Sequence, residues 1–110
     1  MEHKQILEHI HTSFQMESVV YSRHAREEMR VEEFGVIFER EVFEAVTNGE
    51  IIEDYPNDKP YPSILLNGTT KEQRPLHIVI AYDVKEKVTI IVTVYHPNPD
   101  LWIDYRKRKI

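Results

Sequence analysis

"RPLHIVIAYDVKEKVTIIVTVYH", at residues 74–96, decides the fold of this chain. Two runs rich in β-branched and aromatic residues lie on either side of the polar segment "DVKEK". Such residues favour strands, and a short polar connection between two of them predicts an antiparallel hairpin. In the first run Leu76, Ile78 and Ile80 alternate onto one face, so His77 lies on the other.

The register of this hairpin follows from matching the apolar positions of its two strands. Aligning them across the turn predicts the pairs Tyr82–Val88, Ile80–Ile90, Ile78–Val92 and Leu76–Val94. A slip of one residue would oppose apolar to mixed positions, which disfavours it. On the other face His77 is then opposite Thr93 and diagonal to Tyr95. We expect these three side chains to cluster on the sheet face that the helices leave open, although a half-solvated strand surface would have the same residue types.

Helices are predicted before the strands begin. Apolar residues at helical spacing predict a helix over 4–15, with a buried stripe formed by Ile6, Leu7, Ile10 and Phe14. The apolar segment 18–21 is a short link or strand, and Ser22 suits the N-cap of a second helix that ends near Arg30. A further helix is expected over 38–47, with Asn48–Gly49 as its C-cap and with Val42, Phe43 and Val46 pointing inward.

Four strands are predicted after the helices, at 50–55, 63–68, 76–83 and 88–96. Prolines after His96 stop the sheet, and we expect a short helical turn beyond them, with Trp102 and Ile103 packed against the sheet. Helices followed by antiparallel strands indicate an α+β protein. The predicted architecture has N-terminal helices on one face of a mainly antiparallel sheet of about four strands.

The composition is that of a single globular domain without covalent cross-links. The chain has 110 residues, no cysteine and a net charge of −5, which argues against a general nucleic-acid coat protein. Its basic residues nevertheless gather locally, as in the final run "RKRK". No signal peptide, membrane-spanning run or glycine-rich phosphate loop is recognisable, so we expect a cytoplasmic protein with no membrane attachment and no cofactor.

The segment "SRHAREEMR", at residues 22–30, combines a small apolar stripe with charged residues. His24 and Glu28 are four residues apart, so the carboxylate is placed to orient or charge the imidazole. Arg26 and Arg30 have the same spacing and share a face. An exposed helix with Arg–Glu pairs would have this pattern as well.

Histidines, arginines, a tyrosine and a threonine, without cysteine, are the residue types of metal-independent phosphodiester cleavage. The reaction needs a base for the ribose 2′-OH, an acid for the leaving 5′-oxygen, and cations against the charge of the phosphorane. Histidine serves either proton role near neutral pH, tyrosine can donate a proton, and arginine binds phosphate with two hydrogen bonds. His3, His9 and His11 lack a metal-binding spacing, so they predict no metal site.

Four segments, taken in order, resemble a bacterial domain family of unknown function: "SRHAREEM", "VTNGEIIEDYP", "RPLHIVIAY" and "IIVTVYHPNPDLW". Its members have an HAxxxM helix, an NG helix end, a central RPLH strand and a closing TVYxPxP segment. The resemblance covers residues 21–102 of a single domain, with 1–20 as a helical extension and 103–110 as a basic tail. It implies an outlying branch of the RelE-like (barnase–EndoU–colicin–RelE) fold, and a toxin often encoded beside a zinc-finger antitoxin.

The resemblance also implies roles for individual residues. The expected catalytic residues are His24, His77 and Tyr95. The residues expected to bind RNA phosphates are Arg26, Arg74 and Thr93, with Arg30 and Lys71 as further cations. The chain departs from the family pattern at Glu28, where arginine is common. A carboxylate close to a scissile phosphate is unfavourable unless it holds His24.

Three functions remain open at this point. The first is a toxin-like, metal-independent endoribonuclease of the mRNA interferase type, with RNA as its substrate and a zinc-finger antitoxin as its partner. The second is a non-catalytic interaction module on the same fold, which the acidic net charge and Glu28 favour. The third is a metal-binding hydrolase that uses His24, His77 and His96, although the spacing of these residues is irregular.

Overall fold

The computed structural model describes residues 1–110. The helices are α1 (His3–Gln15), α2 (Arg23–Val31) and α3 (Glu39–Asn48). The strands are β1 (Val19–Tyr21), β2 (Glu50–Tyr55), β3 (Ser63–Thr69), β4 (Pro75–Asp83), β5 (Val88–Tyr95), β6 (Trp102–Ile103) and β7 (Lys107–Arg108). The predicted helices and the four predicted strands are therefore confirmed. None of the helices is long and apolar enough to span a membrane.

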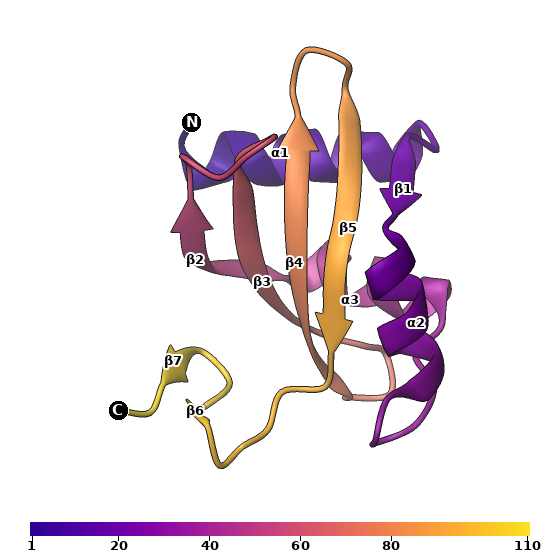
Figure 1. The fold of residues 1–110 in the computed structure, drawn as a ribbon, viewed down its shortest axis with the longest axis vertical. Coiled ribbons are helices and arrows are strands. Elements are labelled where there is room, and N and C mark those ends of the chain that lie inside the picture. Colours follow the sequence, from indigo (N-terminus) through magenta and orange to yellow (C-terminus); the bar gives the residue numbers. More distant parts are fainter.

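One sheet of five strands, in the order β1-β5-β4-β3-β2, organises the molecule (Figure 1). Strands β2 to β5 pair antiparallel, as predicted, whereas β1 adds a parallel fifth strand beside β5. The apolar segment at 18–21, for which a link or a strand was expected, is this edge strand. The fold is thus the predicted α+β class, and its main sheet has one more strand than the predicted four.

The helices cover one face of this sheet and one of its edges. In Figure 1, α1 and α3 lie behind the sheet and α2 lies beside β5. Their apolar residues join those of β3, β4 and β5 in a single core of sixteen buried residues, which includes Ile10, Ala25 and Ile78. Successive residues of a strand point to opposite faces. His77, next to Ile78, therefore points to the face that carries no helix.

Helix α3 packs closely against β3 at a glycine. A Cβ on Gly68 would lie 2.0 Å from the carbonyl oxygen of Ala45, so this approach requires glycine. The small, fully buried Ala45 faces the sheet here. Phe43, which was predicted to point inward, is 50% exposed and lies beside Phe14 of α1. That prediction was wrong because helical spacing shows which side chains share a face of the helix, but not how closely that face approaches the sheet.

The β4–β5 hairpin has a different register from the predicted one. Next to the turn the pairs are Asp83–Val88, Tyr82–Thr89, Ala81–Ile90 and Ile80–Ile91, and after an irregularity they are Val79–Thr93, Ile78–Val94 and His77–Tyr95. Val92 is the extra residue of this β-bulge. His77 therefore lies opposite Tyr95, and Thr93, its predicted partner, lies diagonally. Apolar matching failed because the loop is one residue shorter than predicted, so that Asp83 pairs with Val88, and because the bulge then shifts the register by one more residue.

Ser22 ties the start of α2 to this bulge. As predicted, it is the N-cap, and its Oγ accepts the N–H of Ala25 at 3.0 Å. The same hydroxyl donates to the carbonyl oxygen of Val92 at 2.8 Å. Ala25 and Met29, the predicted apolar stripe, are buried. The position of α2 beside β5 is thus fixed by both polar and apolar contacts.

The end of the chain forms a small hairpin rather than the predicted helical turn. Strand β6 pairs antiparallel with β7 across a turn in which Asp104 and Tyr105 have φ values of 51° and 61°. This left-handed conformation is costly for residues other than glycine, so a turn at Asp104 and Tyr105 was not predictable from residue type. Trp102 is buried, as predicted, but Ile103 is 48% exposed. We call residues 97–110 the C-terminal hairpin; it lies at the lower end of the sheet in Figure 1.

Candidate functional site

His77 lies in a polar row on the helix-free face. Strands β3, β4 and β5 place Asn67, His77 and Tyr95 side by side. The hydroxyl of Tyr95 is 3.1 Å from Nδ1 of His77, and the carbonyl oxygen of Tyr105 is 2.6 Å from Nε2. Because a carbonyl oxygen only accepts, Nε2 carries the proton and donates it to Tyr105, and Nδ1 accepts from Tyr95. Both ring nitrogens of a neutral imidazole are therefore hydrogen-bonded.

The C-terminal hairpin covers His77 completely. The histidine is 0% exposed, and the ring of Trp102 meets its imidazole edge-on with the centroids 4.4 Å apart. Burial lowers the pKa of His77 and raises the pKa of Tyr95 to about 12, since charged forms are poorly solvated there. Both side chains thus stay neutral near neutral pH. The face that was predicted to be open carries no helix, but it is closed over His77.

Ion pairs fasten the hairpin to β2. Nε and Nη2 of Arg108 donate to the two carboxylate oxygens of Glu53 at 2.7 and 3.1 Å, and Arg106 pairs with Glu50. The guanidinium of Arg108 also lies 4.7 Å above the ring of Trp102, in a cation–π contact. The hydrogen bonds from Arg108 hold the pKa of Glu53 below its usual value. The positive charge of Arg108 also helps to lower the pKa of His77, after the larger effect of burial.

His24 lies on α2 beside β5, and it makes no hydrogen bond with His77. Its Nε2 is 3.2 Å from Oε1 of Glu28, which confirms the predicted pairing of these two side chains. The same oxygen of Glu28 accepts the backbone N–H of Val94 at 3.2 Å. Glu28 thus joins α2 to β5, which is a structural reason for a carboxylate at this position. The side chain of His24 is 66% exposed, and both nitrogens of His77 are bonded to other groups.

Arg74 is held on the helix-covered side of the sheet. Its guanidinium donates to the carbonyl oxygens of Gly35 and Val36 and lies 3.4 Å from Oε2 of Glu41 on α3. The side chains of Arg74 and Glu41 are only 17% and 10% exposed. Arg74 thus connects the loop before α3 to the start of β4, and its hydrogen-bonding groups point away from His77.

The other predicted cations lie on the outer surface. Arg26 pairs with Glu39 at 3.3 Å and Arg30 with Glu27 at 2.7 Å, and Lys71 is exposed between β3 and β4. Of the residues predicted for the site, the structure brings together His77, Tyr95 and, diagonally, Thr93. Of the others, His24, Arg26 and Arg30 lie on α2, and Lys71 and Arg74 lie in the loop between β3 and β4.

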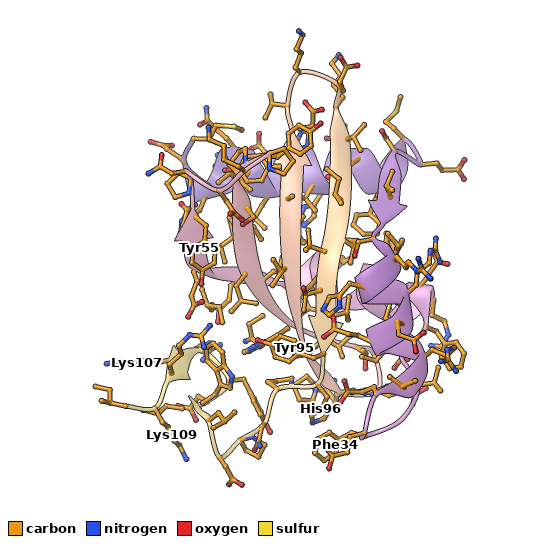
Figure 2. The ribbon with its side chains drawn as sticks, viewed as in Figure 1. Phe34, Tyr55, Tyr95, His96, Lys107 and Lys109 are labelled. Atoms are coloured by element: carbon orange, nitrogen blue, oxygen red, sulfur yellow. The ribbon has the colours of Figure 1, made fainter.

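The histidines of the metal-binding alternative are also separate. His96 stacks on Phe34 with ring centroids 4.5 Å apart, and its Nδ1 is buried without a hydrogen-bond partner (Figure 2). No group of three or more His, Asp or Glu side chains in the chain is placed to share a metal ion. The geometry therefore offers no common ligand set for His24, His77 and His96.

The segment that contains His77 and Tyr95 falls within a known sequence family. A family model described as a domain of unknown function, DUF4258, matches residues 21–96. The chain belongs to the DUF4258 family. The match begins where the motifs begin, at Tyr21, and ends at His96, before the expected limit at Trp102. No curated protein and no solved structure matches the chain significantly.

Two elements lie outside the DUF4258 match. Helix α1 completes the core with Ile6 and Ile10. The C-terminal hairpin contributes no residue to that core; it is attached by the buried Trp102, which packs on His77, and by polar contacts with His77, Glu50 and Glu53. The DUF4258 domain therefore supplies His77 and Tyr95, while the groups that cover them come from outside it.

Sequence reasoning missed Glu53, Tyr105 and Arg108, which cover and border His77, and it predicted the packing of Trp102 against the sheet but not its contact with His77. The basic run at the end of the chain was evident, but the Arg108–Glu53 pair spans 55 residues of sequence. The acidic strand segment "EIIEDY", at 50–55, was the available sign of its partner. No local pattern indicates that the backbone carbonyl of Tyr105 binds an imidazole.

Proposed function

We propose that this protein is a toxin-like endoribonuclease that cleaves RNA without a metal ion, through His77 and Tyr95. The observation that supports it best is the 3.1 Å contact between the Tyr95 hydroxyl and Nδ1 of His77 on the helix-free face. Helices followed by a mostly antiparallel sheet agree with the proposed relation to the RelE-like fold. A zinc-finger antitoxin is the proposed partner, on the strength of the motif resemblance.

These two side chains can meet the proton balance of cleavage. In the tautomer with the proton on Nδ1, His77 takes the proton of the ribose 2′-OH at Nε2 while the 2′-oxygen bonds to phosphorus. The bond from phosphorus to the 5′-oxygen breaks, and Tyr95 gives its hydroxyl proton to that oxygen. Tyr95 then regains a proton from Nδ1, which leaves the Nε2–H tautomer seen here. The products carry a 2′,3′-cyclic phosphate and a 5′-hydroxyl.

The decisive experiment is cleavage of RNA by the purified protein in the presence of a chelator. We expect fragments that end in a 2′,3′-cyclic phosphate, detected by mass spectrometry. His77→Ala and Tyr95→Phe should each slow cleavage about 100-fold or more, the usual contribution of an acid or base. Arg40→Gln, an exposed substitution on α3, is the control and should retain activity. A folded wild type that cleaves no RNA when free of any partner contradicts the proposal.

A non-catalytic interaction module is the second candidate, and the complete burial of His77 favours it. With both ring nitrogens bonded, the imidazole serves as an attachment point for the C-terminal hairpin. In that case His77→Ala changes the stability of the hairpin, and there is no cleavage to lose. The same assay separates the candidates, because only the nuclease yields cyclic-phosphate ends that disappear in His77→Ala.

A further inference from the structure

The C-terminal hairpin both covers His77 and carries four consecutive cations, Arg106 to Lys109. We propose that it is an RNA-operated cover. The phosphates of a single-stranded RNA bind these cations, draw Arg106 and Arg108 away from Glu50 and Glu53, and so uncover His77. This inference rests on the proposed function, since it makes the substrate the agent that opens its own site.

The attachment of the hairpin suits a cover that opens. No residue of the hairpin belongs to the sixteen-residue core, and its two strands have two residues each. Its turn holds Asp104 and Tyr105 in the left-handed conformation, which is strained for residues with a side chain. Opening exposes the buried indole of Trp102, but it removes no member of the sixteen-residue core and so leaves that core intact.

The contacts that hold the hairpin closed are ones for which phosphate competes. The side chains of Arg106 and Arg108 are each 63% exposed although both are ion-paired, so an anion can approach them from solvent. Phosphate, like carboxylate, binds guanidinium with two parallel hydrogen bonds. Figure 2 shows Lys107 and Lys109 on the outer side of the hairpin, directed away from the sheet. These lysines offer the first contact for RNA while the cover is still closed.

The cations must move with the RNA because the sheet itself is acidic there. Without the hairpin, the face around His77 presents Glu50 and Glu53, which repel phosphate. A phosphate held by Arg108 neutralises this repulsion at the same place. The departure of the Tyr105 carbonyl frees Nε2 of His77, so the imidazole can change tautomer and accept the proton of a 2′-OH. The transfer of Arg108 to an RNA phosphate and the release of His77 for proton transfer are thus one step.

The test uses the full chain and a short single-stranded RNA methylated at every 2′-oxygen, which binds but cannot be cleaved. One readout is affinity at several salt concentrations. The other is hydrogen exchange of the Nε2 proton of His77, followed by NMR, which the Tyr105 carbonyl protects in the closed form. The matched control is Arg40→Gln, because Arg40 is also exposed (62%), ion-paired and stacked over an aromatic ring.

We expect the RNA to accelerate exchange of the His77 proton in the wild type. Arg108→Gln should weaken binding about fivefold, the effect of one exposed charge contact. It should also reduce the salt slope by about 0.7, the value for one phosphate on a single strand. Arg40→Gln should change neither quantity. Glu53→Gln removes the competing carboxylate, so it should tighten binding and speed exchange even without RNA.

Two results overturn the cover: a His77 proton that stays equally protected when RNA is bound, or an Arg108→Gln variant that binds as tightly as Arg40→Gln. The proposed function fails separately. If the methylated RNA uncovers His77 but ordinary RNA is not cleaved, the cover stands and the nuclease proposal falls. If ordinary RNA is cleaved while the His77 proton stays protected, the nuclease stands and the cover falls.

Discussion

The two faces of the sheet are covered in different ways. Under the helices, Leu76, Ile78 and Ile80 of β4 are fully buried among apolar side chains. Under the C-terminal hairpin, the same strand presents His77, whose surroundings are two hydrogen bonds and an aromatic ring. Apolar burial is non-directional, whereas a polar contact depends on its particular partner and can be exchanged for another one. On one side β4 thus contributes to stability through apolar burial, and on the other it presents polar groups whose partners can be exchanged.

The largest expected effect tests the helix-covered face with two neighbours on β4. Ile78→Ala should lower the free energy of unfolding by about 2–5 kcal/mol, because it leaves a cavity in the core. Val79→Ala, on the other face and only half-buried, should cost about 1 kcal/mol. Urea denaturation of both variants measures the difference. Equal losses would show that the two faces contribute alike to the free energy of unfolding.

A second prediction compares two arginines on the helix side. Arg74→Ala leaves the carboxylate of Glu41 buried without its partner, so it should cost about 3 kcal/mol of unfolding free energy. Arg40→Ala should cost less than about 1 kcal/mol, because the Arg40 side chain is 62% exposed, its contact with Glu44 is a long 4.0 Å, and Glu44 keeps its hydrogen bond from the backbone N–H of Lys71. Denaturant titration of the two variants separates these values. A mild effect of Arg74→Ala on stability with a strong effect on RNA binding would restore the predicted phosphate-binding role of Arg74.

The pH dependence of stability tests the burial of His77. Burial lowers the pKa of His77 in the folded protein. As the pH falls through the ordinary histidine pKa, about 6.5, the imidazole is therefore protonated in the unfolded chain while it is still neutral in the folded one. The free energy of unfolding should therefore fall as the pH falls from about 8 to about 5. His96, whose pKa is also lowered by burial, acts in the same direction. His77→Gln should reduce this pH dependence without removing it, and an unchanged profile would contradict the buried neutral imidazole.

The smallest expected effect concerns the hairpin itself. Arg106→Gln breaks an exposed ion pair with Glu50, so the free energy of unfolding should change by less than about 0.5 kcal/mol. Hydrogen exchange of the Nε2 proton of His77 should nevertheless become faster, since the cover opens more often. A large global loss of stability would mean that the hairpin belongs to the core after all.

The strands and helices were predictable because their signals are local. Alternation in β4 and helical spacing in α1 and α2 each lie within a few residues, and the N-cap at Ser22 needs only its own helix. The register of β5 was not predictable, because a single extra residue at Val92 leaves the composition of the strand unchanged. It depends on Ser22, which bonds the Val92 carbonyl from 70 residues away.

The candidate site was predicted in part for the same reason. His77 and Tyr95 were placed together because both lie on one hairpin. The partners of Arg74 at Gly35 and Val36, and of Arg108 at Glu53, are 38 to 55 residues distant in sequence. Such pairs form because the loop before α3 and the C-terminal hairpin pack against the sheet. No spacing rule connects them.

The bulge at Val92 also determines which side chains at the end of β5 face the core and which face His77. Thr89 and Ile91 face the core before it, and Val94 faces the core after it, so Thr93 and Tyr95 turn toward His77. If β5 instead paired with β4 without a bulge, so that Val92 lay opposite Val79, odd and even positions would be exchanged over the end of β5. Tyr95 would then point its hydroxyl into the apolar core, and His77 would face Val94. The pairing of phenol and imidazole thus depends on Val92 staying out of the ladder as much as on which residues form the pair.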